Sequence, residues 1–305
     1  MPNPAATKAS FSQRHPILFG LMLLAAAMAL FGGAMAAFHL LPTGEFAGAR
    51  LGVVRVEGLI VGSEDLVGWI GELERDDSIK GVLLRIDSPG GVVAPSQEVY
   101  AAVLRLAERK PVIASMGAVA ASGGYYIAAA AQEIMANPST LTGSIGVRME
   151  LLNIRALAEK VGLSQTLITS GEMKGAGTPF REMSPREREY LTAVVMDMHD
   201  QFVSDIAQAR GMEREQVAAL ADGRAFTGRQ AHGLGLVDHL GGMEDAMDLL
   251  RERCGLTGET PVLEGPIEEK SLLLRVLSAA IIEPVSEAVS EMTSAISAPR
   301  WVFLF

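Results

Sequence analysis

Short apolar runs alternate with amphipathic segments between residues 51 and 137, and this alternation constrains the fold more than any other feature of the sequence. We expect buried strands at residues 51–58, 80–87, 111–117 and 132–137. Helical patterns at residues 63–74 and 95–110 separate the first three of these runs. Because strands that alternate with helices pair in parallel, the sequence predicts a layered α/β domain.

The second half of the chain is more helical. Ser184 to Glu187 reads as a capping box with proline at the first helical position, so a long helix should begin there and end near Gly211. The tail from about Pro266 is amphipathic and ends in PRWVFLF. We expect this tail to pack on a neighbouring subunit; lying on a membrane surface or entering a site are the alternatives.

The N-terminal segment 16–41 contains no Asp, Glu, Lys or Arg. About 20 apolar residues cross a bilayer as a helix, so this segment is either a retained anchor or a cleaved signal peptide. The AMA pattern at 34–36 would suit cleavage, but the apolar run is longer than a usual signal peptide, which favours an anchor. Since Lys8 and Arg14 precede it, we expect a cytoplasmic N-terminus and a domain on the extracytoplasmic side of the inner membrane.

Composition excludes several classes of function. The formal net charge of -10 argues against nucleic acid as a partner. The single cysteine, Cys254, excludes an intrachain disulfide and a cysteine-based zinc site. No phosphate-binding, dinucleotide-binding or metalloprotease motif is present in the sequence. We therefore expect no metal and no organic cofactor.

Two glycine-rich turns lie between a strand and a helical segment. In AASGG, at 120–124, Ser122 is a candidate nucleophile, although a small residue at a helix start is the alternative. In DSPGG, at 87–91, paired glycines allow backbone N–H groups to point into a cavity, although a plain tight turn is equally compatible. Together the turns could supply a hydroxyl and two backbone donors, which acyl transfer requires.

A serine nucleophile needs a base, and none of the five histidines has a distinctive local context. Lysine can take this role where its ammonium group is desolvated. Most lysines lie among charged residues, whereas Lys174 lies in the glycine-rich segment TSGEMKGAGTPF with Glu172 as its nearest charge. A solvated surface lysine is the alternative for this residue taken alone, but with two oxyanion-type turns Lys174 is the best candidate base.

The order of the motifs between Leu51 and Leu250 resembles the signal peptide peptidase A family in its short, single-repeat form. The resemblance rests on DSPGG, AVAASGGYYIA, LTGSIGV, SGEMKGAGTPF and GRAFTGRQAHGLGLVDHLGG, in that order. It implies an α/β fold of the Clp/crotonase type, a superhelix of ββα units, preceded here by one N-terminal transmembrane helix.

The resemblance also implies roles for particular residues. Ser122 would be the nucleophile and Lys174 the general base. The N–H groups of Gly91 and Gly123 would form the oxyanion hole, and Ser144 would orient the lysine. In this family the serine and lysine of one site come from neighbouring protomers, which implies a ring-like homo-oligomer.

We therefore expect a membrane-anchored serine endopeptidase with a Ser-Lys dyad that degrades cleaved signal peptides at the membrane. The alternatives are a related protease acting on membrane proteins in quality control, a non-hydrolytic scaffold of the same fold, and an acyl-CoA enzyme. The last is disfavoured by the export signal and the negative charge. The expected organisation is a cytoplasmic N-terminus at 1–15, the anchor at 16–41, a linker at 42–50, the protease domain at 51–255 and the tail at 256–305.

Overall fold

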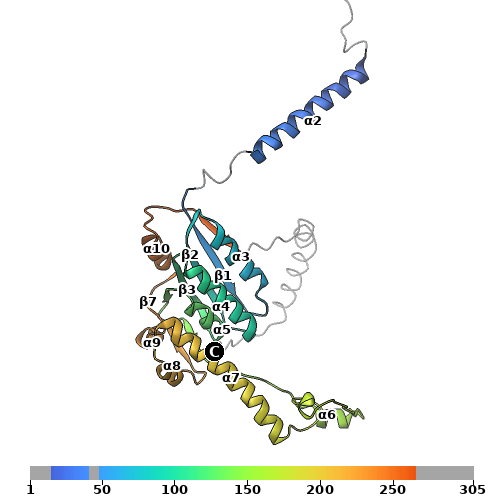
Figure 1. Ribbon diagram of the computed structural model, residues 1–305, viewed down its shortest axis with the longest axis vertical. Helices are drawn as coiled ribbons and strands as arrows, with labels where there is room; N and C mark the ends of the chain where they lie inside the picture. The colour runs from blue at the N-terminus through green and yellow to red at the C-terminus, as the bar shows by residue number, and fades with distance from the viewer. Residues whose placement is uncertain (1–14, 41–47, 266–305) are drawn as a thin grey trace, which may run out of the picture.

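The computed structural model describes residues 15–40 and 48–265 of the chain. Within those residues, eight strands form one sheet with the order β6-β5-β3-β2-β1-β8, to which β4 and β7 add beside β3 (Figure 1). The strands are β1 (Arg50–Glu57), β2 (Ile79–Ser88), β3 (Val112–Ala121), β4 (Glu133–Ala136), β5 (Leu141–Gly143), β6 (Ala225–Thr227), β7 (His239–Leu240) and β8 (Val262–Gly265).

Strand pairing is parallel throughout the described sheet except between β5 and β6. The strand β3 has two partners on the same side, because residues 113–116 pair with β4 and residues 119–121 pair with β5. The sheet therefore divides toward the carboxyl end of β3, directly before Ser122. The predicted parallel α/β arrangement is confirmed.

Helices α3, α4 and α5 cover one face of the sheet and α10 covers the other. The described helices are, in chain order, α2 (Pro16–Leu40), α3 (Glu64–Arg75), α4 (Val93–Ala107), α5 (Gly123–Ala129), α6 (Arg155–Lys160), α7 (Pro185–Arg210), α8 (Arg214–Leu220), α9 (Gly228–Gly233) and α10 (Met243–Arg253), with one 3-10 turn, η1 (Glu172–Gly175). The predicted capping box is present at the start of α7, and Gly211 ends that helix in the left-handed conformation.

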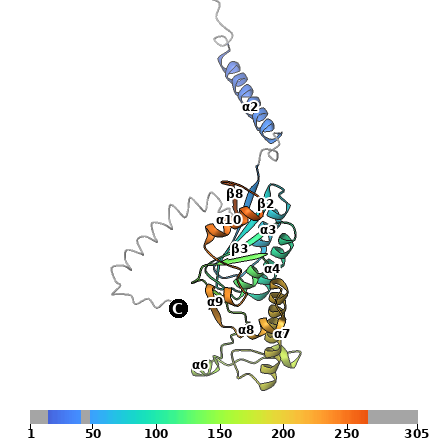
Figure 2. The ribbon, with the colours of Figure 1, turned by 90° about the vertical axis from the view of Figure 1, so that its left-hand side faces the viewer.

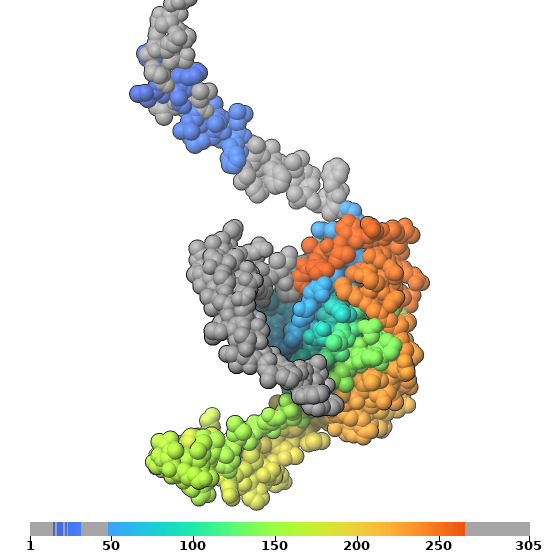
Figure 3. All heavy atoms as spheres, turned by 180° about the vertical axis from the view of Figure 1, so that it is seen from behind, coloured from blue at the N-terminus to red at the C-terminus, as the bar shows by residue number. Residues whose placement is uncertain are grey.

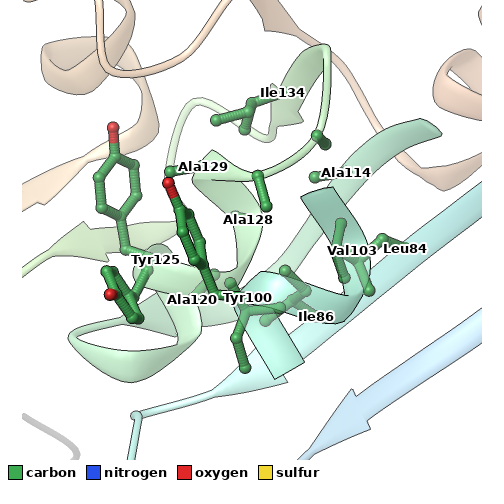
Figure 4. Close-up of a cluster of buried hydrophobic side chains, with 14 of the residues drawn as sticks. Leu84, Ile86, Tyr100, Val103, Ala114, Ala120, Tyr125, Ala128, Ala129 and Ile134 are labelled. Atoms are coloured by element: carbon green, nitrogen blue, oxygen red, sulfur yellow. The ribbon is translucent and has the colours of Figure 1, made fainter. Parts of the chain in front are cut away.

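The core follows from alternation along the buried strands. On one face, Val54 and Val56 of β1 belong to the main cluster, together with side chains of α3, α4 and α5. Figure 4 shows Tyr125 and Ala128 of α5 in this cluster, close to strands β2 and β3. On the opposite face, Leu51 and Val53 pack in a smaller cluster with α10. Burial on both faces explains the nearly continuous apolar runs of these strands.

The observed elements depart from the sequence expectations in two places. The helix expected over residues 63–74 begins one residue later, at Glu64, and Ser63 is its N-cap residue. The Ser63 hydroxyl donates to the carboxylate of Glu98 on α4 and makes no side-chain cap. The sheet also continues past residue 255, because β8 pairs in parallel with residues 51–54 of β1. The folded body thus extends beyond the expected end of the protease domain.

The segment expected to be an anchor is helical over Pro16–Leu40, as α2. In the described part of the chain, no helix combines the length and the apolar composition that crossing a membrane requires. The N-terminal residues 1–14, most of the expected linker and the tail from residue 266 lie outside the described residues.

An arm, residues 148–184, projects from the body and carries α6 and η1 (Figures 1 and 2). Seen from behind, its yellow-green atoms extend away from the sheet together with the first part of α7 (Figure 3). Between residues 151 and 184 only Ala158 and Gly175 are buried. The arm is therefore held by hydrogen bonds and ion pairs more than by a core of its own.

Candidate active site

Ser122 lies at the sharp turn between β3 and α5, with a φ of 53°. A positive φ is strained for a residue other than glycine and persists only where the surroundings enforce it. Here the Ser122 N–H donates to Gly143 O at 2.8 Å, and its carbonyl accepts from Tyr126 N at 2.9 Å. The long-range pairing of β3 with β5 thus holds the serine in a strand-to-helix turn suited to a nucleophile.

The DSPGG turn lies against this serine. Val92 N donates to Ile60 O at 2.8 Å and Ile60 N donates to Gly90 O at 3.0 Å, which forms a bridge across Gly91. In a parallel bridge of this kind the N–H of the middle residue points away from its partner strand. A Cβ on Gly91 would lie only 2.0 Å from Ile60 O, so no other residue fits at this position.

The two glycine turns meet at Ser122. A Cβ built on Gly123 would lie 3.3 Å from the amide nitrogen of Gly91 and 2.5 Å from Ser96 Oγ. Gly123 is the first residue of α5, so its N–H has no partner inside the helix. The structure therefore brings together the predicted nucleophile and both predicted oxyanion donors.

A pocket opens beside these groups. It is lined by Gly91, Val93, Ser96, Gln97, Ser122, Gly123, Tyr126, Gly146, Val147, Met198 and Phe202. Tyr126 packs edge-on against Phe202 and is stacked on Tyr100, with ring centroids 4.7 Å and 4.5 Å apart. The pocket is thus largely apolar, with an aromatic floor.

The hydroxyl groups of the two stacked tyrosines are both bonded to Asp205. The Tyr126 hydroxyl donates to the Asp205 carboxylate, and the Tyr100 hydroxyl donates to Asp205 O at 3.2 Å. Burial raises the pKa of Tyr100 to about 12, and burial also raises the pKa of Tyr126. Both tyrosines consequently remain neutral near pH 7, and Tyr126 adds no charge to the pocket wall.

Ser144 directly follows a residue that is hydrogen-bonded to Ser122, but it does not line the pocket. It follows Gly143, whose carbonyl accepts from Ser122, and it also has a positive φ, of 51°. Its N–H donates to Arg224 O at 2.9 Å, and Gly146 and Val147, just beyond it, do line the pocket. Its predicted contact with a lysine stays a prediction.

Lys174 is not among the pocket residues. It lies in η1 within the arm, with its side chain exposed, whereas Ser122 lies in the body. No histidine lines the pocket either: His199 Nε2 contacts Ala221 O at 2.7 Å, and His239 pairs with Glu133. A single chain therefore presents a serine and two backbone donors, with its candidate lysine elsewhere.

Five residues of the pocket wall lie outside the motifs found in the sequence: Val93, Ser96, Gln97, Met198 and Phe202. Met198 and Phe202 are four residues apart on α7, so helical periodicity places them on one face. That this face lies over Ser122 depends on the packing of α7 against α5, for which the sequence carries no local signal.

A strained serine beside two backbone donors and an apolar pocket defines a serine-type hydrolase of acyl groups. The sequence profile of peptidase family S49 matches residues 105–257. The putative protease slr0021 of Synechocystis is 45% identical over 64% of this chain and 70% of its own length. The putative protease MJ0651 of Methanocaldococcus jannaschii is 37% identical, over 68% and 66%. The putative signal peptide peptidase SppA of Enterococcus faecium is 38% identical, over 63% and 56%.

The chain therefore belongs to peptidase family S49 and is a serine peptidase. The mixed α/β body with its central sheet fits that family. This membership decides against the acyl-CoA enzyme considered from the sequence.

Proposed function

We propose that the protein is a membrane-anchored endopeptidase in which Ser122 and Lys174 form a catalytic dyad and degrade signal peptides released from their preproteins. One observation carries the chemistry: the strained Ser122 lies against the Gly91 and Gly123 amides in a pocket without histidine. The largely apolar wall of that pocket supports hydrophobic peptides as substrates.

In the proposed reaction Ser122 Oγ attacks the peptide carbonyl carbon while the neutral amine of Lys174 accepts its proton. The N–H groups of Gly91 and Gly123 stabilise the resulting oxyanion, an effect worth roughly 3–4 kcal/mol per donor in comparable hydrolases. The lysine then returns the proton to the leaving amine, and water hydrolyses the acyl-enzyme. Ser144 orients the lysine amine by a hydrogen bond.

We further propose that the lysine of each site comes from a neighbouring protomer of a ring of the Clp/crotonase type. Two observations support this proposal. Lys174 lies in the arm, outside the pocket of its own chain, and the arm exposes a concentration of apolar side chains that a neighbour would cover. These side chains include Leu151, Leu152, Leu157, Val161, Leu163 and Ile168, of which Ile168 is 91% exposed.

Membrane anchoring rests on the sequence of the N-terminal segment. Residues 16–41 contain no Asp, Glu, Lys or Arg, and this composition alone supports the anchor. An anchor followed by a short linker would hold the peptidase close to the surface where released signal peptides remain.

Co-expression of two inactive variants tests this proposal. Full-length Ser122→Ala and Lys174→Ala chains would carry different affinity tags, and doubly tagged assemblies would be assayed with an apolar fluorogenic peptide. Each variant alone should be inactive. If sites form between protomers by random assembly, about a quarter receive an intact serine and an intact lysine, so about a quarter of wild-type activity should return. An active Ser122→Ala enzyme would refute the proposed function, whereas a dead mixture would refute only the shared site.

A further inference from the structure

Arg181 connects the segment that carries Lys174 to the start of α7. Its Nη2 donates to Gly175 O at 3.2 Å, and Gly175 directly follows Lys174 in η1. Its Nη1 donates to Glu187 Oε2 at 2.7 Å and to Glu182 O at 3.1 Å, and Nη2 also contacts Glu187 Oε1. One guanidinium group thus bonds to η1 and to α7 at the same time.

Glu187 is the fixed end of this connection. Its side chain is buried, and it occupies the third position of α7, where Ser184 N donates to its Oε2 at 2.9 Å. Hydrogen bonds from Arg181, and then from the Ser184 N–H, lower the pKa of Glu187 to about 2. The carboxylate is therefore ionised near neutral pH and held by the capping box of a 26-residue helix.

The turn η1 is short and has little buried surface of its own. It is four residues long, with Lys174 N donating to Gly171 O and Ala176 N donating to Met173 O, both at 3.1 Å. Gly175 is its only buried residue, and a Cβ there would lie 2.6 Å from Leu167 Cδ2. A second tie joins Arg186 of α7 to Glu172 of η1, at 2.5 Å, but both of those side chains are exposed. The bond from Arg181 to Gly175 O differs because it ends on the backbone of the turn and its other partner, Glu187, is buried.

We propose that Arg181, held by Glu187, is the positioning residue for the catalytic lysine, because it fixes the orientation of the turn that bears Lys174. This inference rests on the proposed function. A reactive group must be held to within about 0.5 Å of its productive place, and residues on a segment without a core need hydrogen bonds to achieve this. The planar guanidinium can bridge a carboxylate and a carbonyl together, which a lysine ammonium matches poorly.

Three full-length variants test the proposal: Arg181→Ala, Arg181→Lys and, as the matched control, Arg155→Ala. Arg155 forms an exposed ion pair with Glu159 in α6 of the same arm, so its loss also removes one arginine and one pair. The kcat and KM for an apolar fluorogenic peptide would be measured, with the assembly state of each variant followed by size-exclusion chromatography.

We expect Arg181→Ala to lose about 100-fold in kcat with KM within about twofold of wild type, since a misplacement near 1 Å has this cost. Arg181→Lys should keep the assembly but recover little of the rate. Guanidinium ions at millimolar concentration should restore part of the Arg181→Ala rate and leave the Arg155→Ala rate unchanged. A purely structural role predicts instead fewer assembled molecules with unchanged kcat per assembled site.

The proposal is overturned if Arg181→Ala keeps the kcat of Arg155→Ala, or if its loss lies only in KM or in assembly. Should Arg181→Ala fail to assemble, Arg181→Lys decides: a wild-type kcat overturns the proposal, and a reduced kcat in an intact assembly supports it. Lys174→Ala separates this inference from the proposed function. An active Lys174→Ala enzyme contradicts the dyad itself, whereas a dead one beside fully active Arg181 variants contradicts only the positioning role.

Discussion

Replacement of Gly123 by alanine should slow turnover about 100-fold while leaving substrate affinity nearly unchanged. The new Cβ would lie 2.5 Å from Ser96 Oγ, whereas ordinary contact begins at 3.4 Å, so the two groups must separate by about 0.9 Å. Ser96 cannot easily yield, because its side chain is buried and its hydroxyl donates to Val92 O at 2.9 Å. The Gly123 amide and the neighbouring Ser122 should therefore move.

The magnitude follows from the size of this displacement. An error of about 1 Å in the position of reacting groups costs about 100-fold in rate, which corresponds to about 2.7 kcal/mol of activation free energy. Loss of one oxyanion donor costs a similar amount. Because the donor acts on the charge that develops in the transition state, the effect should appear in kcat and spare KM.

The assay compares four full-length enzymes: wild type, Gly123→Ala, Ser96→Ala and the double variant. Ser96→Ala removes the obstructing oxygen, so alanine at 123 should be far less harmful in the double variant, which we expect to recover at least about tenfold over Gly123→Ala. Gly68→Ala serves as the control, since a Cβ at this position in α3 meets nothing within 4 Å. Wild-type kcat in Gly123→Ala, or no recovery in the double variant, would refute the assignment of this amide.

Two further predictions concern stability. Arg210→Ala should cost about 3 kcal/mol of unfolding free energy, because Arg210 is 6% exposed and donates to Asp238 Oδ1 at 2.6 Å. The control, Arg224→Ala, removes an exposed ion pair and should cost less than about 1 kcal/mol. Equal losses of unfolding free energy for the two variants in denaturant titrations would contradict this prediction. The pKa of Glu187 falls from 4.5 to about 2 on folding, so the ionised carboxylate stabilises the fold fully above pH 4.5 and progressively less as the pH falls toward 2. The melting temperature of the wild type should therefore fall faster than that of Glu187→Gln between pH 4.5 and pH 2. Parallel plots of melting temperature against pH would contradict this prediction.

The sequence alone located the helices and strands whose ends depend on interactions between residues close together in the chain. The capping box at Ser184 and the left-handed glycine at 211 define the ends of α7, and both lie where the sequence predicts. Apolar runs flanked by turn residues located β1 to β4 to within a few residues. The exception is β3, which continues to Ala121, because its last residues gain a partner in β5 that no local pattern reveals.

The candidate site shows where sequence reasoning reaches its limit. The motifs identified Ser122, Gly91 and Gly123 as residue types suited to acyl transfer, and these residues do meet in space. Their meeting depends on the bridge between Ile60 and Gly91, which joins segments 31 positions apart. The positive φ of Ser144 likewise follows from the bond between its N–H and Arg224 O, and a serine gives no sign of such a conformation.

The separation of Lys174 from Ser122 gives the proposed assembly a physical rationale. The body holds Ser122 and both proposed oxyanion donors in turns fixed by β-pairing, while the arm holds Lys174, the proposed base, in a turn tied to α7. A chain whose base is remote from its nucleophile would carry no complete site until a neighbour covers the apolar arm. Under the proposed function, burial of that surface would stabilise the assembly and deliver the lysine in the same step, so that peptide cleavage would begin only in an assembled ring.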